Sequence, residues 1–250
     1  MEIEGTNKKI FITGISAGIG RVLATQLVKS GYEVWGLARR KDLLEKLKQE
    51  LGPKLTISAC DLSDIEEMRN TAKLMREANF IPDVVVLNAA VHQRDVNNGL
   101  LFNEAHLTVK TNLDGPLFWI SEFLPDFLKK QGGLFVGISS TAAYRPHKGT
   151  VSYAATKAAL SMAFRGLRVS FIQTGIRFST VHFGPIATDM WWGKKISLVS
   201  SPEDAARFIV SVFEKRSGSY FFPFISTAFM RLTSLLPDSA YVFFASLLKK

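Results

Sequence analysis

Short apolar runs alternate with longer stretches of helical spacing along most of the chain. The runs with the length and composition of strands are residues 8–14, 33–38, 54–59, 83–88, 133–139 and 177–183. Helical spacing predicts helices near 18–30, 41–51, 63–78, 103–130, 151–174 and 202–216. This order is typical of a doubly wound, mostly parallel sheet with helices on both faces, and the run 219–223 would add a seventh strand. We therefore predict a three-layer α/β fold with six or seven strands, built as one domain over residues 1–250.

Composition and charge narrow the class of protein and its partners. The chain is 47% hydrophobic and 21% charged, as in ordinary globular proteins. Its formal net charge of +9 favours an anionic partner, which could be a phosphorylated cofactor, an acidic lipid surface or a nucleic acid. Lysines and arginines are scattered and form no basic stripe interleaved with aromatic residues, so we expect no nucleic-acid partner.

The cysteine, the histidines and the start of the chain bear on compartment and metals. Cys60 has no second cysteine with which to form an internal disulfide, and the first residues are too polar and charged for a secretory signal peptide. We therefore expect a cytoplasmic protein. We expect no metal site, because the histidines show no ligand spacing with one another or with Cys60. They are His92, His106, His147 and His182, and we expect each to be structural or exposed.

The first predicted strand leads directly into a glycine-rich turn, TGISAGIG at residues 13–20, and a helix follows. Gly14 would allow a tight turn, Gly18 a close approach of the backbone to an anion, and Gly20 close packing of helix on strand. Backbone N–H groups at the start of the helix would then face a pyrophosphate. The motif predicts a dinucleotide site, with a plain strand-to-helix turn as the alternative.

The end of the second predicted strand indicates which dinucleotide binds. NAD-binding proteins usually present a carboxylate to the adenine ribose roughly 20 residues beyond the glycines. Here the segment GLARRKD places the neutral Ala38 at that point, followed by Arg39 and Arg40. Two guanidinium groups suit the 2′-phosphate of NADP(H), so we predict this cofactor. The alternative is that the two arginines belong to a solvated surface turn.

The predicted helix 151–174 carries Tyr153 and Lys157 four residues apart, so both side chains share one face. A nearby ammonium would lower the pKa of the phenol, which is about 10 when free. Tyr153 would then serve as a general acid or base, although the spacing alone occurs by chance in many helices. Small residues surround the pair and leave room for a flat ligand: Ala154, Ala155, Ala158 and Ala159.

Seven short motifs stand in the order in which the short-chain dehydrogenase/reductase family presents them. They are TGISAGIG (13–20), CDLSD (60–64), NAA (88–90), TNLDG (111–115), ISS (138–140), YAATK (153–157) and GPIATDM (184–190). The chain thus resembles the compact, single-domain members of that family, and the resemblance implies a Rossmann fold. NAA in place of Asn-Ala-Gly and GPI in place of the Pro-Gly order are departures that remove no group the chemistry needs.

The resemblance implies four catalytic residues. Tyr153 would donate a proton to a carbonyl oxygen while NADPH delivers hydride to the carbon, and Lys157 would hold the nicotinamide ribose and keep the pKa of Tyr153 low. Ser140 would hydrogen-bond the substrate oxygen; its neighbour Ser139 is the rival, and strand alternation lets only one of the two face the cleft. Asn112 would hold a water that links the lysine to solvent, with a backbone-bonded helix residue as the alternative.

The same resemblance implies the cofactor contacts. Asp61 would accept a hydrogen bond from the adenine amino group, and it could also cap the helix that begins near Ser63. Asn88 and Ala89 would line the adenine ribose, and the GPIAT segment would bind the carboxamide. The full predicted set is Gly14, Ser16, Gly18, Ile19, Gly20, Arg39, Arg40, Asp61, Leu62, Asn88, Ala89, Tyr153, Lys157, Pro185, Ile186 and Thr188.

In this family, substrate specificity lies after the GPIATDM motif and in the C-terminus. Trp191 and Trp192 follow that motif here, which indicates either an apolar or ring-containing substrate or a lid docked by the two tryptophans. His147, between Ser140 and Tyr153 in the sequence, is a further candidate for substrate contact.

The C-terminal extension, residues 219–250, is strongly apolar. Pro223, Arg231, Pro237 and Asp238 divide it into pieces too short to span a membrane, so we predict two short amphipathic helices packed on the domain or on a partner. They could cover the active site, form the interface of a homodimer or homotetramer, or lie on a membrane surface, where the two C-terminal lysines would assist. We rank lid or oligomer packing first and peripheral membrane contact second.

These features lead us to interpret the chain as an NADP(H)-dependent oxidoreductase. It would interconvert a carbonyl and a secondary alcohol on an apolar small molecule. The alternative is a nucleotide sensor or scaffold that keeps the fold and lacks catalysis, against which the presence of Ser140, Tyr153 and Lys157 argues. The fold by itself does not identify the substrate.

Overall fold

Seven parallel strands form one sheet in this structure, a computed structural model that describes residues 8–93, 99–146, 149–190 and 199–247. The strand order is β3-β2-β1-β4-β5-β6-β7. The strands are β1 (Lys9–Thr13), β2 (Glu33–Ala38), β3 (Leu55–Ala59), β4 (Val84–Leu87), β5 (Gly133–Ser140), β6 (Ile176–Phe183) and β7 (Gly218–Phe222). Every neighbouring pair is parallel, which confirms the predicted fold and its seventh strand.

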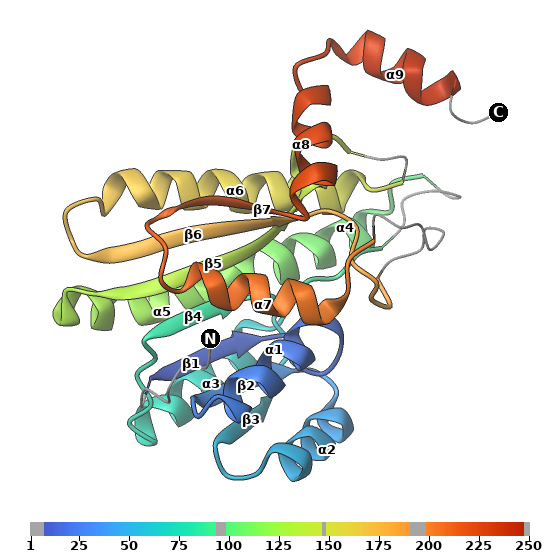
Figure 1. Cartoon of the computed structure of the whole chain (residues 1–250). Coiled ribbons are helices and arrows are strands. Elements are labelled where there is room, and N and C mark those ends of the chain that lie inside the picture. Colours follow the sequence, from blue (N-terminus) through green and yellow to red (C-terminus); the bar gives the residue numbers. More distant parts are fainter. Residues whose placement is uncertain (1–7, 94–98, 147–148, 191–198, 248–250) are drawn as a thin grey trace.

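Helices cover both faces of the sheet (Figure 1). One layer consists of α1 (Gly18–Lys29), α2 (Lys41–Leu51) and α7 (Pro202–Val212), and the other of α3 (Ile65–Glu77), α5 (Gly115–Lys130) and α6 (Val151–Ser170). The centre of strand β1, residues 10–12, is apolar because side chains on both of its faces are buried. Ile10 and Ile12 enter the core beneath the first layer, while Phe11 packs on Trp119 of α5 with ring centroids 4.6 Å apart.

The stretch predicted as one helix over 103–130 is instead interrupted. It consists of α4 (Phe102–Val109), a π-helical turn over Lys110–Asp114, and α5. Asn112 is fully buried within that turn, and its side chain bonds the backbone of Val91. A π turn leaves the apolar spacing nearly continuous, which is why the pattern along the chain does not reveal it. Helices α6 and α7 also end earlier than predicted, at Ser170 and Val212.

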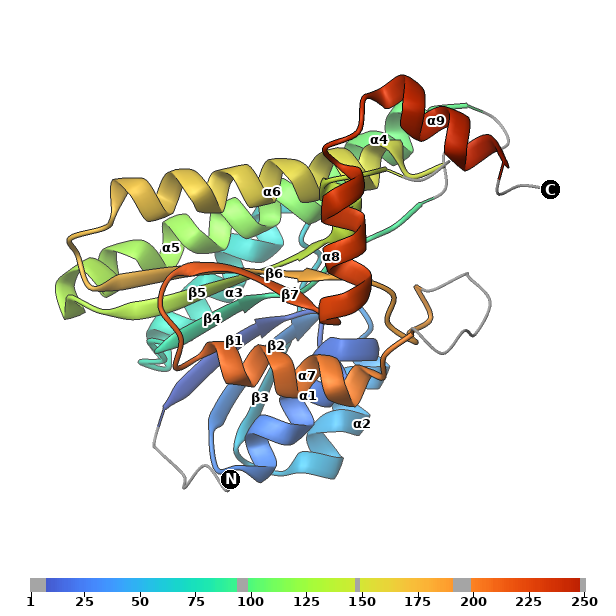
Figure 2. The ribbon, with the colours of Figure 1, turned by 45° about the horizontal axis from the view of Figure 1, so that its top comes forward.

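Two short helices close the described chain, as the sequence predicts: α8 (Phe224–Thr233) and α9 (Asp238–Leu247). Helix α8 rises from the end of β7, and α9 crosses its tip at a distance from the sheet (Figures 1 and 2). Within the ranges that the structure describes, no helix has both the length and the apolar character needed to cross a membrane.

The topology fixes where a ligand site can form. Strands β1 and β4 are neighbours in the sheet, but the chain leaves β1 toward β2 and leaves β4 toward β5. The connections therefore diverge at the carboxyl ends of β1 and β4 and open a crevice there. The glycine-rich turn predicted for residues 13–20 emerges at this edge.

Candidate active site

A cavity of about 820 Å³ opens at the carboxyl ends of the strands. Its volume falls in the range of about 300–1,000 Å³ that is typical of small-molecule and cofactor sites. All predicted cofactor-binding residues line it, together with Ser140, Tyr153 and Lys157. The structure thus brings together in one cavity residues that are far apart in the sequence, and only Asn112 of the predicted set lies outside its lining.

The glycine-rich turn forms one end of the cavity with bare backbone. Gly14 has φ +80°, and a Cβ there would lie 2.8 Å from the Cα of Ala89. A Cβ at Gly20 would overlap the carbonyl oxygen of Gly14. Ala17, which precedes α1, supplies no side-chain cap, so the N–H groups at the start of the helix are left for an anionic ligand.

Asn88 and Thr13 hold this turn in place. The Asn88 Nδ2 donates to the carbonyl oxygens of Thr13 and Gly14, at 3.0 and 3.2 Å. The Thr13 hydroxyl accepts hydrogen bonds from the backbone N–H groups of Asn88 and Ala89, both at 3.1 Å. Asn88 therefore shapes the turn as well as lining the cavity, and Thr13 is a positioning residue that sequence reasoning missed.

Two arginines stand at the rim beyond β2. Arg40 donates from Nε and Nη2 to the Ser16 hydroxyl, at 3.3 and 2.9 Å. The Arg39 Nη1 lies 3.7 Å from the Asp61 Oδ2. Both guanidinium groups are exposed and line the cavity, so they can reach a ligand at the rim.

The prediction that Asp61 could also cap the helix beginning near Ser63 is wrong. Helix α3 begins at Ile65 and is capped by Asp64, whose Oδ1 accepts hydrogen bonds from the backbone N–H groups of Glu66 (2.8 Å) and Glu67 (3.2 Å). Asp61 lies too far before that helix. Its Oδ1 instead accepts from the backbone N–H and the hydroxyl of Ser63, which fixes its carboxylate at the cavity wall.

Ser140, Tyr153 and Lys157 meet where β5 and α6 adjoin. Tyr153 and Ser140 are hydrogen-bonded through their side chains. The buried Lys157 Nζ donates to the Ile138 carbonyl oxygen at 2.7 Å and lies 5.7 Å from the centre of the Tyr153 ring. The Ser139 hydroxyl instead donates to the Lys157 carbonyl oxygen at 3.1 Å, within the contact between strand and helix.

Burial controls the ionisation of Tyr153 and Lys157. It raises the pKa of Tyr153 to about 12, against the lowering effect of the hydrogen bond with Ser140. It lowers the pKa of Lys157 to about 8. The expectation that Lys157 keeps the pKa of Tyr153 low is wrong for this structure, because the ammonium is bonded to backbone 5.7 Å from the ring centre and burial dominates. At neutral pH the phenol is protonated and the lysine mostly charged.

Asn112 lies behind the cavity wall and links two elements of the site. Its Oδ1 accepts from the Val91 N–H at 2.8 Å, and its Nδ2 donates to the Val91 carbonyl oxygen at 2.9 Å. The same Nδ2 lies 3.2 Å from the Thr156 hydroxyl on α6. These contacts match the alternative of a backbone-bonding polar residue and tie the segment after β4 to the helix that carries Tyr153.

His92 belongs to the site, although the sequence pattern indicated a structural or exposed residue. Its ring stacks on that of Tyr153, with centroids 4.2 Å apart and planes inclined by 29°. It also lines the cavity. The signal available in the sequence was its place just after β4, at the edge where the carboxyl ends of parallel strands meet.

Residues of α8 also line the cavity, namely Ile225, Ser226, Phe229 and Met230. Trp191, Trp192 and His147, the predicted substrate contacts, lie outside the described residues. Among the residues whose placement is described, no three His, Cys, Asp or Glu side chains gather in a way that could hold a metal ion.

Solved structures show the same fold. A short-chain dehydrogenase from Streptomyces avermitilis aligns with a TM-score of 0.83 and 23% identity, covering 100% of this chain and 98% of that one. Two further structures each align with a TM-score of 0.79 over 86% of this chain. A serine dehydrogenase in complex with NADP+ is 21% identical over 94% of its own chain, and a 4-hydroxyisoleucine dehydrogenase in complex with NADH is 20% identical over 96% of its own.

Sequence comparison gives the family. A serine 3-dehydrogenase of Agrobacterium fabrum is 31% identical over 181 residues, which are 72% of this chain and 72% of that protein. The family model for short chain dehydrogenases matches residues 8–197. The chain therefore belongs to the short chain dehydrogenase family, a family of oxidoreductases that use a nicotinamide cofactor.

Proposed function

We propose that this protein is an NADP(H)-dependent oxidoreductase that interconverts a carbonyl and a secondary alcohol on an apolar small molecule. One observation carries the proposal: Ser140, Tyr153 and Lys157 line the same cavity as the glycine-rich turn. A proton donor, a hydrogen-bonding hydroxyl and an ammonium are the groups that a carbonyl reduction requires. A sensor or scaffold would need the turn but not these three side chains.

The residues present fit a dinucleotide. The bare backbone at Gly14 and Gly20, where a Cβ would collide, leaves room for a pyrophosphate beside the start of α1. Arg39 and Arg40 would hold a 2′-phosphate, and Arg40 is already oriented by Ser16. The two dehydrogenases compared above were solved with NADP+ and with NADH, so the preference for NADP(H) rests on the arginines. When bound, the nicotinamide supplies or accepts the hydride.

Tyr153 moves the proton in the proposed reaction. In the direction of reduction, the hydroxyls of Ser140 and Tyr153 hold the carbonyl oxygen, and Tyr153 donates its proton to it. A pKa of about 12 keeps the phenol protonated, and hence ready to donate, at neutral pH. Lys157, whose Nζ lies 5.7 Å from the centre of the Tyr153 ring in the same cavity, would hold the hydroxyls of the nicotinamide ribose.

The wall near the site favours an apolar substrate. Its side chains beyond the catalytic group are largely hydrophobic: Val91, Phe183, Met190, Ile225, Phe229 and Met230. A homodimer or homotetramer and a cytoplasmic location stay predictions.

Turnover with a panel of substrates tests the proposal. The purified chain is mixed with NADPH and separate aldehydes and ketones of increasing apolar size, and the loss of NADPH absorbance is followed. We expect oxidation of NADPH with at least one apolar carbonyl. NADPH binding without turnover of any carbonyl or alcohol would favour the sensor or scaffold instead.

A further inference from the structure

The C-terminal helices present an apolar surface that the rest of the described chain does not cover. This tail surface consists of Phe224, Ile225, Phe229, Leu232, Leu235, Leu236 and Phe243, which are 40% to 78% exposed. Ile225, Phe229 and Leu232 follow one another at helical spacing on α8, so they form a stripe. Within α8 and α9 only Arg231 and Asp238 are charged.

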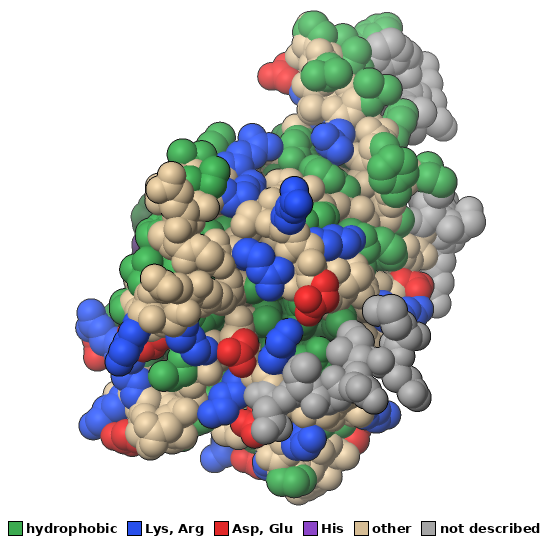
Figure 3. Space-filling view, turned by 60° about the vertical axis from the view of Figure 1, so that its left-hand side comes forward, with side chains coloured by type: hydrophobic (Ala, Val, Ile, Leu, Met, Phe, Trp, Pro, Cys, Tyr) green, Lys and Arg blue, Asp and Glu red, His purple; other side chains and the backbone are tan. Residues whose placement is uncertain are grey.

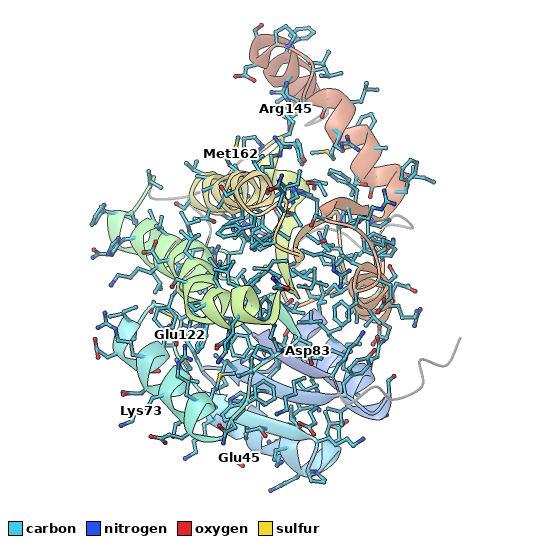
Figure 4. All side chains as sticks on the ribbon, turned by 90° about the vertical axis from the view of Figure 1, so that its left-hand side faces the viewer. Glu45, Lys73, Asp83, Glu122, Arg145 and Met162 are labelled. Carbon is cyan, nitrogen blue, oxygen red and sulfur yellow. The ribbon has the colours of Figure 1, made fainter. Side chains whose placement is uncertain are left out.

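Arg145 fixes the direction in which this surface faces. Its side chain is only 7% exposed, and it donates from Nε to the Thr233 carbonyl oxygen at 2.9 Å and from Nη2 to that of Leu236. Its Nη1 donates to the Asp238 Oδ1 at 2.5 Å, and its guanidinium carbon lies 4.8 Å from the centre of the Tyr241 ring. Figure 4 shows Arg145 beside the two helices. A buried cation with this many partners holds the junction of α8 and α9 in one geometry.

The tail surface is continuous with the mouth of the cavity. Ile225 and Phe229 line the cavity and are nevertheless 75% and 65% exposed. Met230, beside them on α8, also lines it. An apolar path therefore leads from the outside of the molecule along α8 into the proposed site.

Charge indicates what covers this surface. The chain has a net charge of +9, and the positive charges of Arg231 on α8 and of Arg165 and Arg168 on α6 all act on the buried His182, where they help to lower its pKa. Figure 3 shows several Lys and Arg side chains over the body beneath the protruding tail, whose own surface is mostly hydrophobic. An apolar face rimmed by cations is the pattern of helices that lie in the interface of an anionic bilayer. A second copy would instead bring together two molecules that each carry a net charge of +9.

We propose that α8 and α9 bind the surface of an anionic lipid bilayer and that the cavity takes its carbonyl substrate from that membrane. The second half rests on the proposed function, while the first half stands without it. The substrate class would be lipophilic aldehydes or ketones, which dissolve in a bilayer and would enter along Ile225 and Phe229.

Vesicle flotation of the full chain tests the surface. Vesicles of phosphatidylcholine and phosphatidylserine in equal parts, at low salt, are compared with phosphatidylcholine alone. Leu232→Asp with Leu235→Asp alters the tail outside the cavity lining, and Leu74→Asp with Ile172→Asp is the control, at residues 54% and 80% exposed elsewhere. We expect the unaltered chain and the control to float with the anionic vesicles and the tail variant to bind at least about tenfold more weakly.

Turnover tests the substrate. With NADPH, the tail variant should match the control on a short water-soluble aldehyde and be about tenfold slower on a long-chain aldehyde held in anionic vesicles. If the tail variant and the control have equal rates on the long-chain aldehyde as well as on the short one, membrane supply of the substrate is overturned. The surface assignment is overturned if the unaltered chain does not float at low salt, or if the tail variant floats equally well. If the tail variant gives a smaller particle than the unaltered chain in light scattering while its flotation is unchanged, the tail surface binds a second copy of the chain and not a membrane. If the chain floats with the vesicles but turns over no carbonyl, the proposed function is wrong and the membrane-binding surface stands.

Discussion

The imidazole of His92 covers one face of the Tyr153 phenol, with ring centroids 4.2 Å apart. The preceding residue, Val91, is held at both its N–H and its carbonyl oxygen by the Asn112 side chain. The π-helical turn that carries Asn112 therefore positions His92, and through it Tyr153, the proposed proton donor. This relationship joins three segments that are far apart in the sequence.

Removing the imidazole should slow the reaction. In His92→Ala, Tyr153 loses its stacking partner and gains rotational freedom, and we expect kcat to fall about fivefold, the equivalent of an aromatic pair worth about 1 kcal/mol. The KM for NADPH should stay the same. His92→Phe, which keeps a flat ring, should recover most of the rate. An equal loss in both variants would assign the effect to the imidazole nitrogens and not to the stack.

Asn112→Ala should lower stability as well as rate. The substitution leaves the Val91 N–H and carbonyl oxygen without the Asn112 partner, which costs about 1–3 kcal/mol for a buried group. Urea unfolding followed by circular dichroism measures this loss. A free energy of unfolding unchanged in Asn112→Ala would contradict the positioning role.

Tyr153→Phe should abolish turnover and leave cofactor binding intact. The ring and its stack on His92 stay, while the proton donor is lost, so we expect kcat to fall by about 10²–10⁴. The dissociation constant for NADPH, measured by fluorescence, should change little. Unchanged turnover would remove Tyr153 from the mechanism.

The two rim arginines should discriminate between the cofactors. We expect Arg39→Ala with Arg40→Ala to weaken NADPH binding about tenfold to a hundredfold, because charge-assisted hydrogen bonds to the 2′-phosphate are lost. NADH binding should change little, and Arg69→Ala, an exposed arginine on α3, should affect neither. Equal weakening of NADPH and NADH would refute the phosphate assignment.

Lys157 should make stability depend on pH. Its pKa is lowered from 10.5 to about 8 in the folded chain, so between these values the unfolded chain holds more protons and the free energy of unfolding rises with pH. The gain should be on the order of 3 kcal/mol and absent in Lys157→Met. Tyr153 acts in the opposite sense, because its stabilising effect is complete below pH 10 and is lost as pH rises toward about 12. Urea unfolding of both proteins from pH 7 to pH 10 checks the difference, and identical curves would contradict a buried ammonium.

The fold and most of the cavity could be predicted from the sequence because their signals are local. Apolar runs mark the strands, and Gly14 and Gly20 stand where the backbone approaches other groups. The carboxyl ends of parallel strands then bring distant residues together. Alternation predicts that only one of Ser139 and Ser140 faces the cleft, and the family spacing selects Ser140; the Ser139 hydroxyl bonds within the β5–α6 contact.

Features that depend on tertiary contact could not be predicted. Within the π turn, Asn112 reaches Val91 across the fold, and spacing along the helix does not record that bond. The partner of His92 is 61 positions away in the sequence. The pKa of Tyr153 follows from burial, which only the packed structure determines.

The hydrogen bonds of Arg145 connect the segment that follows Ser140 to the junction of α8 and α9. This residue follows Ser140 by five positions, across the 3-10 turn Thr141–Ala143, and its guanidinium reaches carbonyl oxygens between α8 and α9. Truncation of the chain before Thr233 would remove the two carbonyl oxygens, the Asp238 carboxylate and the Tyr241 ring that Arg145 contacts, and the segment after Ser140 would lose this anchor. A deletion of the last helices would therefore disturb the segment beside Ser140 as well as remove the tail surface. Only point substitutions on the outward face of α8 and α9 can separate membrane binding from the proposed catalysis.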